Sequence, residues 1–428
     1  MIVRLLITAL LLGVMLLCSG CYGARETEDI AYVLVIGIDK AADGQQKFTY
    51  QIARPRGAGG GGGGGGEGGE KGEGGAWVIN TFTAPTPSET RMLLKSTMSR
   101  FPNIGHVCAF IIGEEAAREG LGDLMSYFMR NRDFRGTMIM VVTEGTAEEY
   151  IKRNNPKLET SVAKYYETLL ANMESGYYLR TDLHDFYLGL KAEGVSPYAA
   201  YSATNPMSGA DRPAAPPAPE EAGKPYIAGD VPRTGEGDPT EFAGLALFRG
   251  DRMVGILDSD ETRAVSILRS KGVRGYVGIV DPLKPEKNIN IAFRLGAKPK
   301  IKAALSDGAP LYKVSVFIEA EIMGIPSGIN YELGENRVLL ENQISQLFAG
   351  HISRMLRHTQ MLGSDPMGFG LHLRPQFPDY NALKQADFTA LYQAAEIQVS
   401  VTTKIRRTGL DWQTSPWQTQ NAEENPHD

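Results

Sequence analysis

Residues 106–131 read HVCAFIIGEEAAREGLGDLMSYFMRN and join two patterns of different period. The first seven residues are almost all apolar, which predicts a buried strand. From residue 114 onward the apolar side chains recur every three or four positions, which predicts a helix over residues 114–131. The recurring residues are Ala117, Leu121, Leu124 and Phe128. A buried strand that passes directly into an amphipathic helix is typical of a mixed α/β fold.

The same two patterns alternate along the rest of the chain. In the first half, the predicted strands are residues 30–38, 47–53, 77–82 and 137–143, and the predicted helices are residues 91–101, 146–153, 161–173 and 182–191. In the second half, the predicted strands are residues 242–248, 253–257, 289–295, 300–305, 312–322 and 397–405, and the predicted helices are residues 258–269, 334–358 and 381–392. The sequence therefore predicts an α+β, mixed α/β protein with antiparallel or mixed sheets flanked by helices and a long helix near the C-terminus.

Two changes of composition suggest how the chain is divided. Residues 57–75 are nearly all glycine and lack the Gly-Lys-Ser/Thr of a phosphate-binding loop, so we expect a disordered insertion between two strands. Residues 204–239 are rich in Pro, Ala, Gly and Glu, which predicts a linker with a short ordered piece at residues 226–231. We therefore expect an N-terminal mixed α/β region of one or two subdomains at residues 21–203, a C-terminal domain at 240–410 and a flexible tail at 411–428.

The first residues have the pattern of an export signal. Arg4 precedes a thirteen-residue apolar run at residues 5–17, and the small residues Ser19 and Gly20 precede Cys21. Because a bilayer-spanning helix needs about 20 apolar residues, this run fits a cleaved signal peptide better. The pattern resembles a bacterial lipobox, which predicts a lipoprotein signal at residues 1–20. Cys21 would then carry an S-diacylglyceryl group and an N-acyl chain. Two or more acyl chains anchor a protein stably to a membrane, whereas one does not.

Two other interpretations of this segment stay open. The signal could be cleaved in the ordinary way with Cys21 as a bystander, or it could be retained as a short membrane helix. Cys18 also stands where a lipobox usually has leucine. The remaining cysteine, Cys108, lies within an apolar run, so we expect a buried, inert thiol.

Charge and motifs exclude several classes of function. The net charge is −6 and becomes −7 once the residues before Cys21 are removed, which is a poor match for a nucleic-acid-binding protein. Gly-x-Ser-x-Gly and His-Glu-x-x-His are absent, and His351 and His358, seven apart on one predicted helix, are too few for a metal site. We therefore predict no catalytic residues, no cofactor and no metal.

One segment carries a catalytic alternative. Asp258, Asp260 and Thr262 follow an apolar strand, and Asp-x-Asp-x-Thr in that position also begins the phosphatases that form an aspartyl-phosphate. The favoured interpretation is a helix N-terminus, where carboxylates accept hydrogen bonds from free N–H groups. Two further features have structural interpretations: residues 365–370 (DPMGFG) as a turn after the long helix, and Arg406 and Arg407 as solvated charges.

Blocks along nearly the whole chain resemble a known family in order and spacing. The blocks are Cys21 with Arg25 and Glu26; residues 30–40; residues 105–120 with Arg130, Asp133 and Arg135; residues 244–248, 255–257 and 261–263; Asp365 with residues 368–370; and residues 405–409. Together they resemble the Ger(x)C lipoproteins, the C subunits of spore germinant receptors. Departures are the glycine-rich insertion, the Pro-rich linker, Cys18, and Tyr22 where the family usually has Trp.

The resemblance implies a mixed α/β protein of about three domains that assembles with two integral-membrane partners, the A and B subunits. It also implies attachment to the outer face of the spore inner membrane, nutrient sensing, and no catalysis by the lipoprotein itself. No binding residues carry over beyond the lipidated Cys21. Our first hypothesis is therefore a lipid-anchored, non-catalytic scaffold or sensor subunit of a germinant receptor. The alternatives are a substrate-binding lipoprotein of a transporter and an anchored phosphohydrolase that uses Asp258 and Asp260.

Overall fold

The structure, a computed structural model, describes residues 1–8, 26, 29–54, 77–159, 161–171, 176–205, 225–233, 235, 237–271, 274–306, 308–410 and 414. Cys21 and the glycine-rich residues 57–75 lie outside these residues, as do most of the linker at 204–239 and nearly all of the tail after residue 410. The lipidation and the disorder expected of these segments therefore stay predictions.

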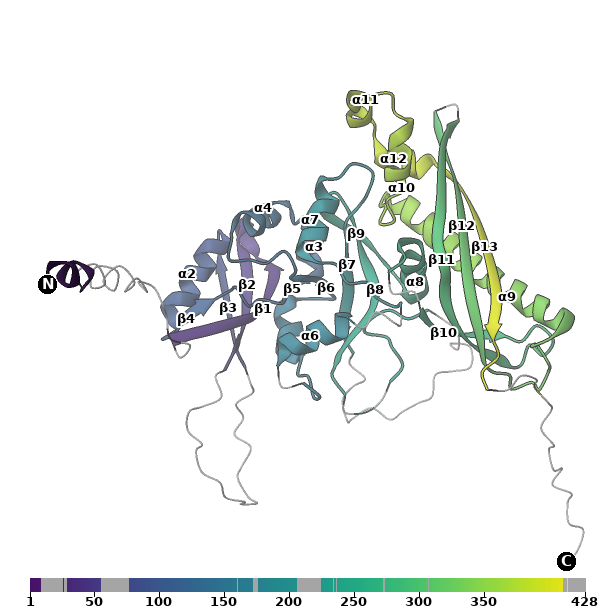
Figure 1. Cartoon of the computed structure of the whole chain (residues 1–428), viewed down its shortest axis with the longest axis horizontal. Helices are drawn as coiled ribbons and strands as arrows, with labels where there is room; N and C mark the ends of the chain where they lie inside the picture. Colours follow the sequence, from purple (N-terminus) through teal and green to yellow (C-terminus); the bar gives the residue numbers. More distant parts are fainter. Residues whose placement is uncertain are drawn as a thin grey trace, which may run out of the picture.

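A large mixed sheet contains most strands of the first half of the chain (Figure 1). Its strands are β1 (Ile30–Lys40), β2 (Gln46–Ala53), β3 (Trp77–Ala84), β4 (Phe101–Asn103), β5 (Ala109–Gly113), β6 (Ile139–Thr143), β7 (Tyr198–Thr204), β8 (Thr240–Arg249) and β9 (Arg252–Leu257). Their order is β3-β2-β1-β5-β6-β7-β8-β9, with β4 beside the start of β1. The central strands β1, β5, β6 and β7 are parallel, β4 is parallel to β1, and the strands on either side of these pair antiparallel. Both β5 and β6 are buried along their whole length, as parallel strands covered on both faces must be.

Helices cover both faces of this sheet. They are α2 (Pro87–Thr97), α3 (Glu114–Glu119), α4 (Gly122–Arg130), α5 (Ala147–Arg153), α6 (Val162–Ala171) and α7 (Leu183–Lys191). One hydrophobic core joins the sheet to α2, α3, α4 and α7, and a second core on the opposite face joins it to α5 and α6. The carboxylate of Asp39, at the end of β1, accepts the backbone N–H groups of Ala147 and Glu148 and so caps α5.

The continuous helix predicted over residues 114–131 is wrong. The chain forms α3 and α4 with a break at Gly120, whose φ of 130° lies outside the helical region and is open to glycine. The carboxylate of Asp251 accepts the Gly122 N–H at 3.0 Å and so satisfies a free donor at the start of α4. The helix predicted to end at residue 101 ends at Thr97 instead, because residues 101–103 pair with β1 as β4.

The large sheet takes strands from both sides of residues 204–239. The pattern of residues 198–204 did not predict β7, and β8 pairs antiparallel with it. The predicted hairpin of β8 and β9 is confirmed and forms one edge of this sheet. The ordered piece expected at residues 226–231 is also present, since the Ala228 N–H donates to the Ala243 carbonyl at 2.8 Å.

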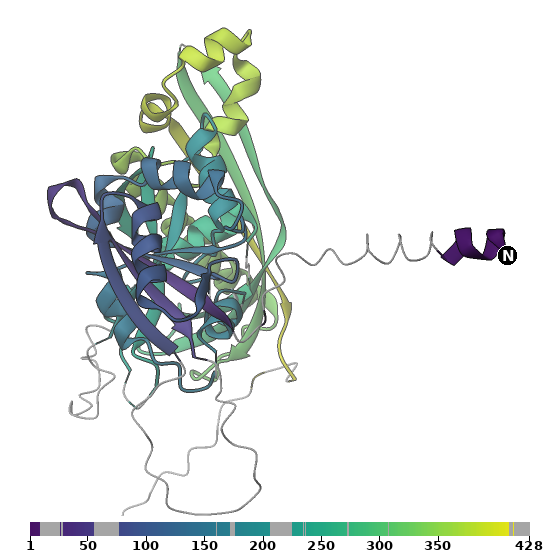
Figure 2. The same ribbon diagram turned by 90° about the vertical axis from the view of Figure 1, so that its left-hand side faces the viewer.

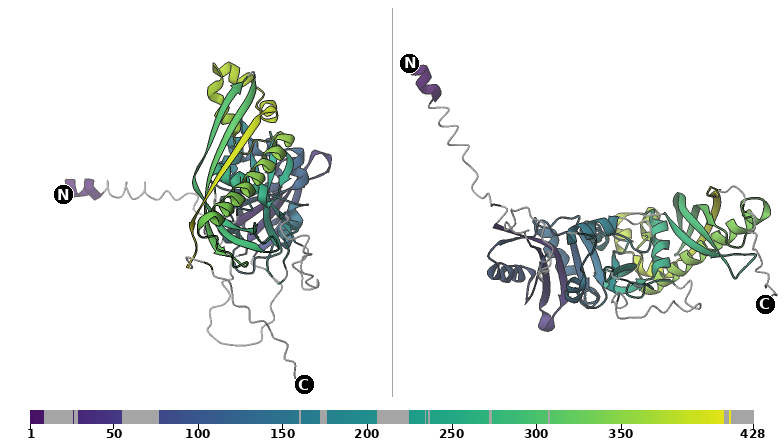
Figure 3. Two further views of the ribbon diagram at one scale, coloured as in Figure 1. Left: turned by 90° about the vertical axis from the view of Figure 1, so that its right-hand side faces the viewer. Right: turned by 90° about the horizontal axis from the view of Figure 1, so that it is seen from below.

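A second sheet and a long helix form most of the C-terminal part. The sheet consists of β10 (Arg274–Val280), β11 (Asn288–Ser306), β12 (Ala309–Gly324) and β13 (Glu396–Arg407), in that order. The strands predicted at 289–295 and 300–305 are one strand, β11, whose pairing with β12 shifts at two places between Leu295 and Lys300. The predicted long helix is confirmed as α9 (Gly334–Leu362), which packs along one face of the sheet (Figure 3).

Short helices follow the long one. They are α10 (Phe369–Leu373), α11 (Tyr380–Gln385) and α12 (Phe388–Ala394). The single helix predicted at residues 381–392 is two helices, because the Asp387 carboxylate accepts the Ala390 N–H and begins a new one. Figure 2 shows α11 and α12 at the same end of the molecule as the tip of the β11–β12 hairpin.

One helix joins the two sheets. Almost every residue of α8 (Ser259–Arg269) is buried, because α8 lies between β8 of the large sheet and β11 and α9 of the C-terminal part. A single hydrophobic core accordingly runs from Leu245 and Leu257 through Val265 to Ile291 and Ile344. Among the described residues, no helix is both long and apolar enough to cross a membrane. The predicted fold class is confirmed.

Candidate functional site

The acidic segment that begins α8 is a helix cap. Asp258 accepts the Glu261 N–H at 2.9 Å, and the Glu261 carboxylate accepts the Asp258 N–H at 3.3 Å, which completes a capping box. The interpretation of Asp258 as a helix N-terminus is therefore confirmed. The strand before it, β9, pairs antiparallel with β8. An aspartyl-phosphate site needs a doubly wound parallel sheet at this point. The antiparallel pairing of β9 therefore does not favour the phosphohydrolase alternative.

The same carboxylates hold α8 against α9. Arg354 lies 3.5 Å from both carboxylate oxygens of Asp258 and 3.8 Å from Asp260. His351 Nε2 lies 3.6 Å from Asp260, and His358 Nδ1 lies 3.1 Å from Glu261. The two histidines therefore do share a helix face, but each faces a separate carboxylate. Within the described residues, no group of three His, Cys, Asp or Glu side chains converges on a point that could hold a metal ion.

His351 is better suited to packing than to acid–base chemistry. Burial lowers its pKa, and the neighbouring Asp260 carboxylate opposes that shift only in part. Its ring lies against Phe348, with 6.4 Å between the ring centroids. The polar layer between α8 and α9 thus consists of carboxylates that face Arg354 and two histidines, and these contacts hold the two helices together.

Arg263 connects the two sheets. It is 4% exposed, and its guanidinium lies 4.9 Å from the ring centroid of Tyr177 and 5.6 Å from that of Phe293 on β11. Asp260 provides the nearest carboxylate, at 3.5 Å. A buried guanidinium needs such partners, because unpaired burial of a charge is costly. Arg263 therefore ties α8 to both halves of the molecule.

A second contact between the halves surrounds Asp365. This buried residue accepts the N–H groups of Gly368 and Gly370, which confirms the turn predicted at residues 365–370. Its backbone exchanges two hydrogen bonds with Ser196, which lies between α7 and β7. Burial raises the pKa of Asp365 to about 6, against the effect of the N–H groups that it accepts. The contact is therefore tight and sensitive to the charge of one carboxylate.

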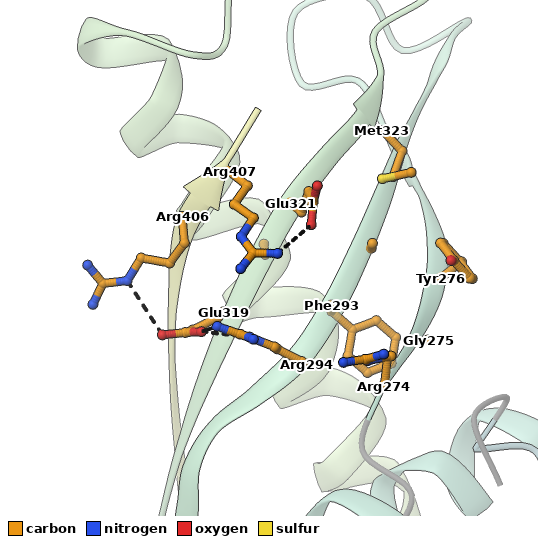
Figure 4. A pocket seen from close by; sticks show the side chains of 12 residues that line it. Arg274, Gly275, Tyr276, Phe293, Arg294, Glu319, Glu321, Met323, Arg406 and Arg407 are labelled. Carbon is orange, nitrogen blue, oxygen red and sulfur yellow. Dashed lines mark hydrogen bonds and ion pairs between the residues drawn. The ribbon is translucent and has the colours of Figure 1, made fainter. Parts of the chain in front are cut away.

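The outer face of the C-terminal sheet differs from these packed regions, because none of the described helices covers it. Side chains alternate along β12, so that Tyr312, Val314, Val316 and Ile318 are buried toward α9 while their neighbours face outward. The outward side bears a shallow hollow of about 240 Å³ (Figure 4). It is lined by Arg274, Tyr276, Arg294, Glu319, Glu321, Met323, Arg406 and Arg407, among others. We take this outer face as the candidate functional site.

Ion pairs order part of this outer face. Glu319 accepts Arg294 at 2.5 Å and lies 3.6 Å from Arg406, while Glu321 lies 3.9 Å from Arg407 (Figure 4). The arginines predicted to be solvated are 58% and 65% exposed, so that expectation holds even though each has a carboxylate partner. Exposed pairs of this kind contribute little to stability. Their arrangement leaves cationic side chains open to a partner.

Sequence reasoning missed this outer face as a site. Its signal was present in residues 298–302, which read KPKIK, because alternation places Lys300 and Lys302 on the same side of β11. Cys21 lies outside the described residues. Cys108 is a packed thiol, and burial raises its pKa to about 12.

Comparison with known proteins identifies the family. Residues 23–203 match the family described as "Spore germination protein N-terminal domain", and residues 243–409 match "Spore germination B3/ GerAC like, C-terminal". The chain belongs to the spore germination Ger(x)C family. A role in spore germination follows from that membership, and the resemblance on which it was first suggested is confirmed.

Relatives in this family cover nearly the full chain. The chain is 26% identical to "Putative spore germination protein YfkR" of Bacillus subtilis, over 93% of this chain and 95% of the relative. It is 24% identical to "Spore germination protein KC" of the same organism, over 96% and 97%. A solved structure, "Crystal Structure of the GerBC protein", is 16% identical and covers 87% of this chain and 96% of its own, with a TM-score of 0.49.

Proposed function

We propose that this chain is the lipid-anchored C subunit of a nutrient germinant receptor. In this role it would be a non-catalytic scaffold or sensor, carried on the outer face of the spore inner membrane beside integral-membrane A and B subunits. One observation carries the proposal: two germination-family domains follow each other along the chain, and the first match begins two residues after Cys21. The anchor then holds the soluble sheets close to the membrane-embedded partners.

The structure supports a binding role over catalysis. The acidic residues of α8 are occupied by capping and by ion pairs with α9, as described above. The transporter alternative expects two lobes with a ligand cleft at the ends of their strands. The C-terminal sheet is instead four-stranded and mostly antiparallel, with one face against a single long helix. That topology does not favour the transporter alternative.

Replacing Cys21 tests the anchor. Spores that express Cys21→Ala or the matched control Cys108→Ala would be supplied with labelled palmitate and then fractionated. We expect label in the wild-type and Cys108→Ala proteins and none in Cys21→Ala, which should also be lost from the membrane fraction. Labelling of the Cys21→Ala protein, or its full retention in the membrane, would show that lipid on Cys21 is not the anchor.

Deleting the gene tests the receptor role. The mutant should sporulate normally but fail to germinate in response to one class of nutrient, such as amino acids or sugars. Affinity purification of the tagged chain from spore membranes should recover two integral-membrane subunits. A normal response of the deletion strain to every nutrient that the parent strain senses would contradict the proposal.

A further inference from the structure

The C-terminal sheet concentrates positive charge in an acidic protein. Its four strands carry nine basic and three acidic residues, whereas the whole chain has a net charge of −6. The acidic residues are Glu319, Glu321 and Glu396. The basic residues are Arg274, Arg294, Lys298, Lys300, Lys302, Lys313, Lys404, Arg406 and Arg407. Lys404 pairs with Glu341 on α9 at 2.6 Å. Because the other face of the sheet is apolar and packed on α9, the rest of this excess charge faces outward.

Folding stability does not account for this arrangement. Arg274 lies directly opposite Arg294 in the pairing of β10 with β11, and Lys302 lies directly opposite Lys313 in the pairing of β11 with β12. Like charges directly opposite each other on antiparallel strands destabilise a sheet. Among the described residues, Lys300, Lys302 and Lys313 have no carboxylate within ion-pair distance. Their positive charge is thus uncompensated along this part of the sheet.

The outer face also has the composition and extent of a surface that meets a lipid interface. Tyr276, Val280 and Met323 are 71%, 50% and 54% exposed. Tyr276 and Val280 lie on β10, and Met323 lines the same hollow as the arginines. The 19 residues of β11 span about 60 Å, so the charges are spread along a strip and are not gathered into one pocket. Lysines on flexible stems act as point charges and suit mobile phosphate groups.

We propose that the outer face of the C-terminal sheet binds an anionic phospholipid surface. The inference rests on the proposed function in one respect, namely that lipid on Cys21 brings the chain to a bilayer. Each Lys or Arg near an anionic membrane strengthens binding by roughly fivefold at moderate ionic strength. The sheet therefore provides a second attachment that sets which side of the molecule faces the membrane.

Vesicle binding tests this proposal without the lipid anchor. The chain from residue 22 onward, which keeps every described strand, would be sedimented with vesicles of phosphatidylcholine alone or mixed with phosphatidylglycerol. A sheet variant would carry Lys300→Gln, Lys302→Gln and Lys313→Gln. A matched control would carry Lys157→Gln, Lys164→Gln and Lys384→Gln, which remove the same charge at exposed positions off the sheet.

We expect binding that requires phosphatidylglycerol, weakens with salt, and falls roughly 10- to 100-fold in the sheet variant but not in the control. The sheet variant should remain folded and unfold at the same or a higher temperature, because it loses a repulsive pair. Equal binding to both vesicle types, or equal binding by wild type and sheet variant, would overturn the proposal. If the sheet variant bound vesicles normally but no longer copurified with receptor subunits, the outer face would be a protein interface instead.

This result is separable from the proposed function. Labelling of the Cys21→Ala protein, or normal germination of the deletion strain, would contradict the proposed function, and either result would leave vesicle binding by the chain from residue 22 onward untouched. Conversely, if the chain is anchored and required for germination but does not bind the anionic vesicles, only the docking inference fails.

Discussion

Replacing Gly370 by alanine should disrupt the contact between the two halves of the molecule. A Cβ atom at this position would lie 2.4 Å from Gly194 Cα and 2.6 Å from the Gly194 carbonyl oxygen, both of them backbone atoms. Ordinary contacts begin near 3.4 Å, so α10 and the loop at Gly194 must separate by about 1 Å. Neither atom belongs to a flexible side chain, so the strain cannot be relieved by a rotamer change.

The cost can be estimated from these contacts. Overpacking of this kind destabilises a protein by roughly 1–3 kcal/mol. Moving Gly370 also stretches its 3.0 Å hydrogen bond to Asp365, which adds about 1–2 kcal/mol. We therefore expect Gly370→Ala to lower the free energy of unfolding by about 2–5 kcal/mol.

Urea unfolding followed by circular dichroism at 222 nm would measure the effect. The matched control is Gly350→Ala on α9, where an added Cβ has no atom within 4 Å. Alanine in an exposed helix interior is about 1 kcal/mol more favourable than glycine, so this control should unfold at higher urea than wild type. If Gly370→Ala unfolded at the same urea concentration as wild type, or at a higher one, the close contact at Gly194 would be refuted.

Three further predictions concern single side chains. Asp365→Asn should flatten the pH dependence of stability. Because the folded pKa of about 6 exceeds the ordinary 3.8, the stability that Asp365 contributes is present below pH 4 and is lost, by on the order of 3 kcal/mol, as pH rises through 6. Urea midpoints of the variant and wild type, measured across that pH window, would show the difference. Asp258→Ala should lower the free energy of unfolding by about 1–2 kcal/mol, whereas Asp258→Ser should keep most of the cap; equal urea midpoints for Asp258→Ala and wild type would argue against the capping box. Cys108 in the chain from residue 22 onward should react with Ellman's reagent in urea but not in the folded state, because burial raises its pKa to about 12; rapid reaction in buffer at pH 8 would contradict this.

The sequence predicts whether most segments are helices or strands, because the spacing of apolar residues follows which side chains are buried. The strand at β12 alternates, and the long helix repeats every three or four residues, so both were predicted nearly to their observed ends. Breaks within elements depend on single residues and were missed. Gly120 divides α3 from α4 through a backbone angle, and Asp387 begins α12 through one carboxylate. Neither event changes the apolar period on which the prediction rests.

Pairing between strands is harder to predict because it depends on contacts distant in sequence. The hairpin of β8 and β9 was expected, but its attachment to β7 was not, since nothing local to residues 240–257 specifies a neighbour. The candidate site depends on the same long-range information. Lys302 and Lys313 belong to different strands, and only the register of β11 against β12 places them opposite each other.

The rigid junction determines what a charged outer face can do. Because α8 is buried between the two sheets and Arg263 contacts aromatic rings on both sides, the C-terminal sheet cannot turn freely relative to the large sheet. Attachment of the outer face to lipid would therefore fix the orientation of the large sheet above the membrane as well. A lipid on Cys21 alone would leave that orientation free, since one tether point restrains distance and not rotation. We expect, for this reason, that loosening the junction with Gly370→Ala would impair germination more than an equal loss of stability placed within either sheet.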